Sequence, residues 1–252
     1  MITVDYSQAD PITGEVPKVR SVQNKGGRPK KEEKVGNKVK AHIRYKNREG
    51  KAIPGTTTIT GLLAKPALIK WANNLGLQGI DSTKYRDKMA DIGILAHYLI
   101  MCHLREVPEK VKLEAMVEYS KDDIDKAENC VLSYFEWEKE HKVEPIVVET
   151  PLVSEAFQFG GTVDCFCKLD GDPTLLDFKT GKGIWPEMFY QLGAYFHLLK
   201  ENGYVVRGAR ILRIGRSEDE GFDEKKVGLM ELDHNWEVFE TLRKLYKLIN
   251  GR

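Results

Sequence analysis

The chain has 252 residues, of which 41% are hydrophobic and 31% are charged, and its net charge is +1. This length allows one domain with a full hydrophobic core and an added arm, and the composition is ordinary for a globular protein. No apolar run approaches the roughly 20 residues that span a bilayer, and residues 1–10 lack the basic and apolar regions of a signal peptide. We therefore expect no membrane contact, a cytoplasmic location and free thiols on all four cysteines.

Basic residues gather near the N-terminus of the chain. Residues 18–51 hold thirteen Lys or Arg against three Glu, whereas residues 52–252 are mildly acidic. Large apolar side chains are scarce before residue 50, and a segment without them cannot bury enough apolar surface to fold. We expect residues 1–50 to form a basic, largely disordered arm that binds a polyanion, and residues 51–252 to form the folded domain.

One short stretch of this arm, KGGRPKK at residues 25–31, resembles the AT-hook, an element that lays Arg-Pro into the DNA minor groove. Proline stiffens the backbone, and arginine seeks the negative potential of a narrow groove. The resemblance implies DNA contacts by Arg28, Lys30 and Lys31. A solvated basic linker is the alternative, because Gly26 stands where the hook usually has its first arginine.

The first part of the domain is expected to be helical. The pattern predicts helices at residues 67–74, 86–105 and 121–141. The second of these is apolar almost all round in its later part, where Gly93 and His97 lie one turn apart on the same face. The imidazole can reach over the glycine toward a partner. The alternative is an ordinary core histidine.

An extended segment is expected at residues 145–157. Its Glu149 is an acid in an otherwise apolar stretch that precedes the next two strands. The residue can be a further ligand, an outer acid of a site or a solvent-facing side chain. The sequence leaves these three interpretations open.

Residues 160–180 form two apolar stretches joined by an Asp-Gly turn, which predicts a tight β-hairpin. With the turn centred on these two residues, Asp164 lies across from Asp177. Opposed carboxylates about 5 Å apart repel each other, and a divalent cation between them would turn the repulsion into attraction. Lys179 projects from the same face as Asp177, because side chains alternate along a strand. The spacing predicts a metal site, and a surface hairpin with ordinary charges is the alternative.

A helix is expected to begin at Pro186 and to run to about residue 201, with Gln191 and Tyr195 one turn apart on one flank. Strands are expected at residues 205–214 and 226–232, and a closing helix at residues 233–250. This order of elements predicts an α/β domain with a mixed central β-sheet flanked by helices.

Four of these motifs, taken in order, resemble the PD-(D/E)XK nuclease superfamily. The closer likeness is to its RecB-like exonuclease branch, which includes phage and mitochondrial DNA exonucleases. The motifs are G-x-x-x-H at residues 93–97, G-T-V-D at 161–164, D-F-K at 177–179 and Q-L-G-A-Y at 191–195. The likeness extends from about residue 86 to about residue 215, and it implies a restriction-endonuclease-like core.

The resemblance also implies a role for each motif residue. The catalytic residues would be Asp164, Asp177 and Lys179. The metal ligands would be His97, Asp164, Asp177 and the backbone carbonyl of Phe178. Gln191 and Tyr195 would hold the substrate strand. Oxygen ligands suit Mg²⁺, and a histidine ligand favours tolerance of Mn²⁺.

The function that this resemblance implies is a Mg²⁺- or Mn²⁺-dependent deoxyribonuclease, in particular an exonuclease of DNA recombination, repair or replication. Its partners would be DNA and a single-strand-annealing or replication protein, in a bacterial or phage-infected cell. Some RecB-like nucleases hold an iron–sulfur cluster on later cysteines, but no cysteine follows Cys167, so no cluster is expected. The alternatives are a structure-specific endonuclease or resolvase, an enzyme acting on another phosphoester, and a non-catalytic DNA-binding protein.

Overall fold

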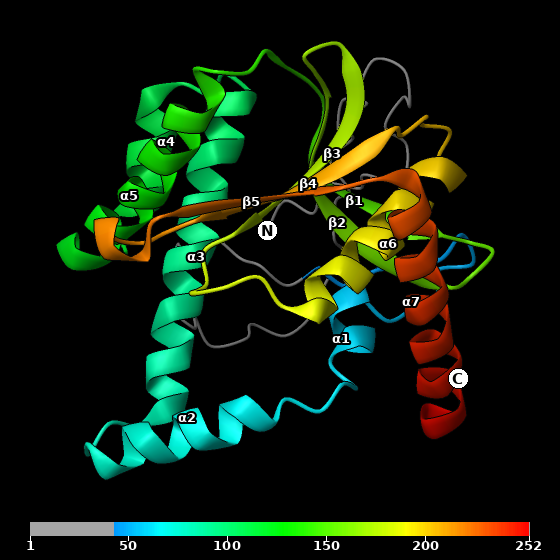
Figure 1. The fold of residues 1–252 in the computed structure, drawn as a ribbon, viewed down its shortest axis with the longest axis horizontal. Coiled ribbons are helices and arrows are strands. Elements are labelled where there is room, and N and C mark those ends of the chain that lie inside the picture. The colour runs from blue at the N-terminus through cyan, green and yellow to red at the C-terminus, as the bar shows by residue number, and fades with distance from the viewer. Residues whose placement is uncertain (1–42, 252) are drawn as a thin grey trace, which may run out of the picture.

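A five-stranded β-sheet forms the centre of the structure, with the strand order β1-β2-β3-β4-β5 (Figure 1). The computed structural model describes residues 43–251. β3 and β4 run parallel, whereas every other pair of neighbours is antiparallel, so the sheet is mixed. The strands are β1 (Val143–Ser154), β2 (Phe159–Leu169), β3 (Asp172–Lys179), β4 (Gly208–Ile214) and β5 (Phe222–Val227).

Helices cover both faces of this sheet, and each face has its own hydrophobic core. α3 and α5 pack on one face, and α6, α7 and the short α1 pack on the other (Figure 1). The helices are α1 (Thr56–Thr60), α2 (Pro66–Leu77), α3 (Ser82–Leu104), α4 (Glu109–Met116), α5 (Lys121–Glu138), α6 (Pro186–Glu201), the 3₁₀ turn η2 (Glu218–Glu220) and α7 (Leu229–Asn250). The predicted α/β domain with a mixed, helix-flanked sheet is confirmed. No helix within residues 43–251 is both long and apolar enough to cross a membrane.

Local sequence signals account for where the main helices begin. Asp81 caps α3 by accepting hydrogen bonds from the backbone N–H groups of Thr83 and Lys84. Ser120 caps α5 in the same way. Pro186 occupies the first turn of α6, as predicted. These signals fix where three of the helices that flank the sheet begin.

Several elements differ from the expectation, including the short α1, which was not predicted. The strand predicted for residues 226–232 ends at Val227, and α7 begins at Leu229, because the extended Gly228 stops the strand and serves as the first cap of the helix. The charged sequence of β5, FDEKKV, suits the edge of a sheet. No helix was predicted between residues 105 and 121, where α4 forms, and its first turn has an acidic residue that favours a helix start.

The β2–β3 hairpin has the predicted register. Strand pairing runs from the turn up to Cys165, which lies opposite Leu176. Asp170 and Gly171 both have a positive φ, of 53° and 94°, as the two-residue turns favoured in hairpins require. Counted from the turn, Cys165 is the last paired residue of β2, and Asp164 is the first unpaired one. The two strands therefore separate where the predicted metal site begins.

A segment at the start of the described chain packs along the end of the β1–β2 hairpin. The Tyr45 hydroxyl lies 2.9 Å from the Thr162 Oγ1 atom, and the Gly160 N–H donates to the Pro54 carbonyl at 3.0 Å. A Cβ atom on Gly160 would collide with the Tyr45 ring, so the close approach depends on this glycine. The segment is thereby held against β2.

The predicted arm lies mostly outside the described residues. Residues 1–42 include Arg28, Lys30 and Lys31, so the DNA contacts expected of these side chains stay predictions. Residues 43–50, which were expected to belong to the arm, pack against the folded domain instead, because Tyr45 and its neighbours hydrogen-bond to β2 and to the loop before it.

Close packing of α6 on α7 depends on Gly193. A Cβ atom there would lie 2.5 Å from the Trp236 backbone nitrogen and 2.6 Å from the Asn235 backbone carbonyl carbon. We expect Gly193→Ala to push the helices apart and to lower the free energy of unfolding by about 1–3 kcal/mol. Urea denaturation measures this change.

Gly76→Ala in α2 is the matched control, because no heavy atom lies within 4 Å of a Cβ built at Gly76. This variant should be stabilised by up to about 1 kcal/mol, since alanine favours a helix more than glycine does. Equal unfolding free energies for the two variants would contradict the role given to Gly193.

Candidate metal and active site

Asp164 and Asp177 lie at the point where β2 and β3 separate. Asp164 is 8% exposed, and Asp177 is fully buried. The Asp164 Oδ2 atom accepts a hydrogen bond of 2.8 Å from the Phe178 backbone N–H. A carboxylate thus takes the place of a strand carbonyl, which fixes Asp164 beside the end of β3.

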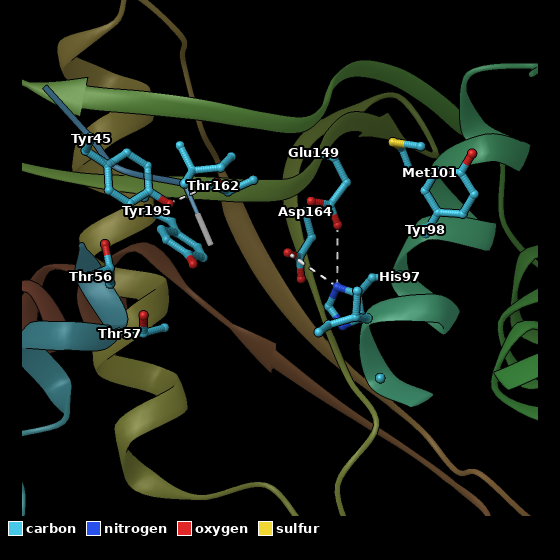
Figure 2. Close-up of a pocket in the computed structure, with 14 residues that line it drawn as sticks. Tyr45, Thr56, Thr57, His97, Tyr98, Met101, Glu149, Thr162, Asp164 and Tyr195 are labelled. Carbon is cyan, nitrogen blue, oxygen red and sulfur yellow. Dashed lines mark hydrogen bonds and ion pairs between the residues drawn. The ribbon is translucent and has the colours of Figure 1, made fainter. Parts of the chain in front are cut away.

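His97 reaches the same place from α3 (Figure 2). Its Nδ1 atom lies 3.7 Å from Asp164 Oδ1, and its ring packs edge-on against the Phe178 ring. A Cβ atom on Gly93 would lie 2.8 Å from the Thr180 Oγ1 atom, just after β3. The space predicted over Gly93 for the imidazole holds Thr180 instead, so the glycine lets α3 approach the end of β3.

Glu149 of β1 completes a group with His97 and Asp164. Its Oε1 atom lies 3.5 Å from the His97 Nδ1 atom (Figure 2). One possible ligand atom from each of the three residues lies within 4.8 Å of the other two. Glu149 lines the same pocket as the other two, which favours a ligand over the solvent-facing alternative.

This group has the composition of a divalent metal site. Opposite ligands of a Mg²⁺ or Mn²⁺ ion, with bonds of about 2.1 Å, lie about 4 Å apart, so small side-chain movements would let all three residues bind one ion. Carboxylate oxygens suit both ions, and an imidazole nitrogen is compatible with Mn²⁺. The residues present therefore fit the predicted cation.

Asp177 lies outside this three-residue group and pairs with Lys179. The Lys179 Nζ atom lies 2.5 Å from Asp177 Oδ2, and the lysine side chain is 15% exposed. Apart from this ion pair, neither carboxylate oxygen of Asp177 has a hydrogen-bond partner among residues 43–251. A buried carboxylate with a free oxygen is unfavourable, and a nearby cation or bound water would satisfy it.

The charges in the pocket control the protonation of its residues. Burial opposes a charge on His97, but Asp164 and Glu149 outweigh burial and raise the pKa of His97 to about 10. Burial raises the pKa of Asp177 to about 6, with Lys179 opposing the shift and Asp164 adding to it. Burial likewise disfavours the charge on Lys179, but Asp177 and Asp164 raise the pKa of this lysine above its usual range. Near neutral pH, three carboxyl groups thus face two cationic side chains, which favours an added cation.

A pocket of about 420 Å³ opens beside the metal group (Figure 2). Tyr195 of α6 lines it, and the Tyr195 hydroxyl accepts a hydrogen bond of 2.6 Å from Gln191 Nε2. Tyr98 and Met101 of α3 line it on the other side of the group. The fold therefore brings Tyr195, with Gln191 bonded to it, to the same pocket as Asp164.

Several residues that line the pocket were not predicted as site residues from the sequence, among them Tyr45 and Thr56 of the N-terminal segment. Thr56, in α1, donates to the Gly160 carbonyl at 3.0 Å, and Tyr45 contacts a residue 117 positions away. No spacing in the sequence signals contacts of this range. Only the packing of the N-terminal segment on β2 reveals this side of the pocket.

Comparison with known proteins adds little to this geometry. No family model and no curated protein matches the chain. Among solved structures, the chain is similar to LHK-Exo in complex with dAMP, with a TM-score of 0.31 and 10% identity. That match spans 62% of this chain and 92% of LHK-Exo. A likeness this distant carries no conclusion about function.

Replacing His97 tests the metal group directly. We expect His97→Ala to raise the Kd for Mn²⁺ by tenfold or more, because loss of even an indirect metal contact typically costs about 10–100-fold in affinity. Isothermal titration calorimetry on the folded variant measures it. His234→Ala, at an exposed position of α7, is the matched control and should bind Mn²⁺ like the wild type. An unchanged Kd in His97→Ala would make His97 an ordinary core residue.

Proposed function

We propose that this protein is a divalent-metal-dependent deoxyribonuclease, an exonuclease that hydrolyses phosphodiester bonds in DNA recombination, repair or replication. The supporting observation is that His97, Glu149 and Asp164 converge on one pocket, next to the buried Asp177–Lys179 pair. Acidic groups alone are common. A buried ammonium held beside such a group suits a reaction in which negative charge develops on a phosphate.

The site residues divide into those that hold the ion and those that act on the substrate. His97, Glu149 and Asp164 hold the ion in this proposal, with Asp177 and the Phe178 carbonyl as the further ligands that the family resemblance implies. A bound Mg²⁺ or Mn²⁺ supplies Lewis acidity and lowers the pKa of a coordinated water. Lys179 stays protonated and offsets charge at the reacting phosphate.

Tyr195 is suited to hold the substrate strand. Its hydroxyl oxygen accepts from Gln191, which leaves the hydroxyl hydrogen available for a phosphate oxygen. Burial, together with the charges of Asp164 and Asp177, raises the pKa of Tyr195 well above its usual range, so the phenol remains a donor. Gln191 fixes the direction of this hydroxyl.

DNA is the partner that this site requires. The resemblance of residues 25–31 to an AT-hook implies further DNA contacts by Arg28, Lys30 and Lys31. An additional single-strand-annealing or replication protein stays a prediction from the resemblance.

Incubation with end-labelled linear DNA and closed circular DNA tests the proposed function. We expect linear DNA to be degraded from its ends with Mg²⁺ or Mn²⁺, closed circles to survive, and excess EDTA to stop the reaction. Cleavage of closed circles would identify an endonuclease. Undiminished cleavage in EDTA, or no cleavage under any metal condition, would contradict a metal-dependent nuclease.

Lys179 separates substrate binding from chemistry. Because the ammonium acts on developing charge, we expect Lys179→Ala to lower the single-turnover cleavage rate by about 10²–10³-fold and to leave DNA affinity in Ca²⁺ unchanged. Lys179→Arg should restore little activity, since a planar guanidinium places its charge differently from a compact ammonium. Lys168→Ala, at an exposed position near the end of β2, is the control. Wild-type rates in Lys179→Ala would place the active site elsewhere.

A further inference from the structure

β1 and β2 bend together beside the metal group. In a regular strand, side chains two positions apart share a face. Val163 nevertheless packs in the core under α6 and α7, whereas Cys165 packs in the core under α3 and α5. These two residues pair with Thr150 and Val148 without a change of register. Between these two pairs, the side chains of both strands therefore switch the face of the sheet to which they point. Glu149 lies at the position in β1 where this switch occurs.

The backbone of Glu149 is strained at this bend. Its φ is 43°, in the left-handed region that side chains other than glycine rarely adopt, and such a conformation persists only where the surroundings hold it. Two side chains hold it here. The Thr150 hydroxyl donates to the Val148 carbonyl at 2.9 Å, and the Arg105 guanidinium donates to the same carbonyl.

Arg105 also connects the bend to the helix that carries His97. It is the residue that follows α3, eight positions after His97. α3 thus supplies the candidate ligand His97. Through Arg105, at its C-terminal end, it also holds β1, the strand that supplies the candidate ligand Glu149. Movement of α3 along the sheet would change both together.

We propose that Arg105 is a positioning residue for the metal site, because its bond to the Val148 carbonyl keeps β1 bent and Glu149 directed at His97. A shift of one residue along a strand sends a side chain to the opposite face of the sheet. A β1 without the bend would therefore point the Glu149 carboxylate away from the pocket. The inference deepens the proposed function, since it concerns the same metal site. It is tested without DNA, so failure of nuclease activity and failure of this inference are distinguishable.

Mn²⁺ affinity measured by isothermal titration calorimetry tests this role. We expect Arg105→Met to raise the Kd by about 10–100-fold, the usual effect of losing a residue that orients a ligand. Glu149→Gln should raise it at least as much. The double variant should bind no more weakly than Glu149→Gln alone, because Arg105 acts only through Glu149. An unchanged Kd in either single variant, or fully additive losses in the double variant, would overturn the proposal.

Two controls keep this test independent of general damage to the fold. Arg207→Met changes another exposed arginine, before β4, and should leave the Kd unchanged. Thr150→Val removes the other bond to the Val148 carbonyl and keeps the branched side chain, so it should also raise the Kd for Mn²⁺. This variant tests the bend even if Arg105→Met fails to fold. A wild-type Kd in Thr150→Val would count against the bend as the feature that positions Glu149.

The strain itself gives a second readout that needs no metal. Glu149→Gly and Glu149→Ala both lose the carboxylate, but only glycine adopts a positive φ without a steric penalty. We expect a higher Tm for Glu149→Gly than for Glu149→Ala in metal-free buffer, the reverse of the usual order in a strand. The usual order, with the alanine variant more stable, would show that Glu149 is not held in the left-handed conformation.

Discussion

Three carboxyl groups lie close together, two in the pocket and one buried beside it, and their mutual repulsion is the constraint on which the rest of the site depends. Two unit charges 4 Å apart near a protein surface interact by about 4 kcal/mol, a large part of the stability of a domain. Glu149, Asp164 and Asp177 therefore need compensation. In the metal-free protein, the protonated His97 and Lys179 provide it. Because an imidazole must lose its proton to bind a metal, a cation would take over this role from the proton on His97.

The fold can hold these charges together because the site lies where regular strand pairing ends. Once β2 and β3 separate, the Phe178 N–H is free to donate to the Asp164 carboxylate. A continuous ladder would use that N–H for a strand carbonyl. At the bend of β1, the Val148 carbonyl likewise accepts hydrogen bonds from the side chains of Arg105 and Thr150. Irregular backbone here replaces strand-to-strand bonds with bonds that orient acidic side chains, as is common near active sites.

The two helical layers complete the pocket from opposite faces. α3 contributes His97 from one face, and its close approach to the end of β3 depends on the absence of a side chain at Gly93. α6 contributes Tyr195 from the other face, with Gln191 bonded to its hydroxyl, and Gly193 lets α7 pack behind α6. A sheet covered on both sides can bury a carboxylate such as Asp177 completely. A buried charge without a partner is strongly destabilising, so Asp177 depends on its ion pair with the Lys179 ammonium.

By itself, the sequence determined the features that depend on short-range chemistry. The Asp-Gly turn set the register of the hairpin that carries Asp164 and Asp177, and Pro186 marked the start of α6. The strand predicted for residues 226–232 was wrong beyond Val227, because Gly228 ends β5 and the residues after it begin α7. These features are local because a turn or a cap is decided by the few residues that form it.

Only the tertiary structure decided that Glu149 joins His97 and Asp164, and which residues close the pocket. Glu149 could have faced solvent, since its direction follows from a bend held by Arg105, 44 positions earlier in the chain, and not from strand alternation. Tyr45 meets Thr162 across 117 positions because Gly160 has no side chain to keep it away. Contacts of this kind depend on how the elements pack, and packing is a property of the whole chain that no local pattern of residues encodes.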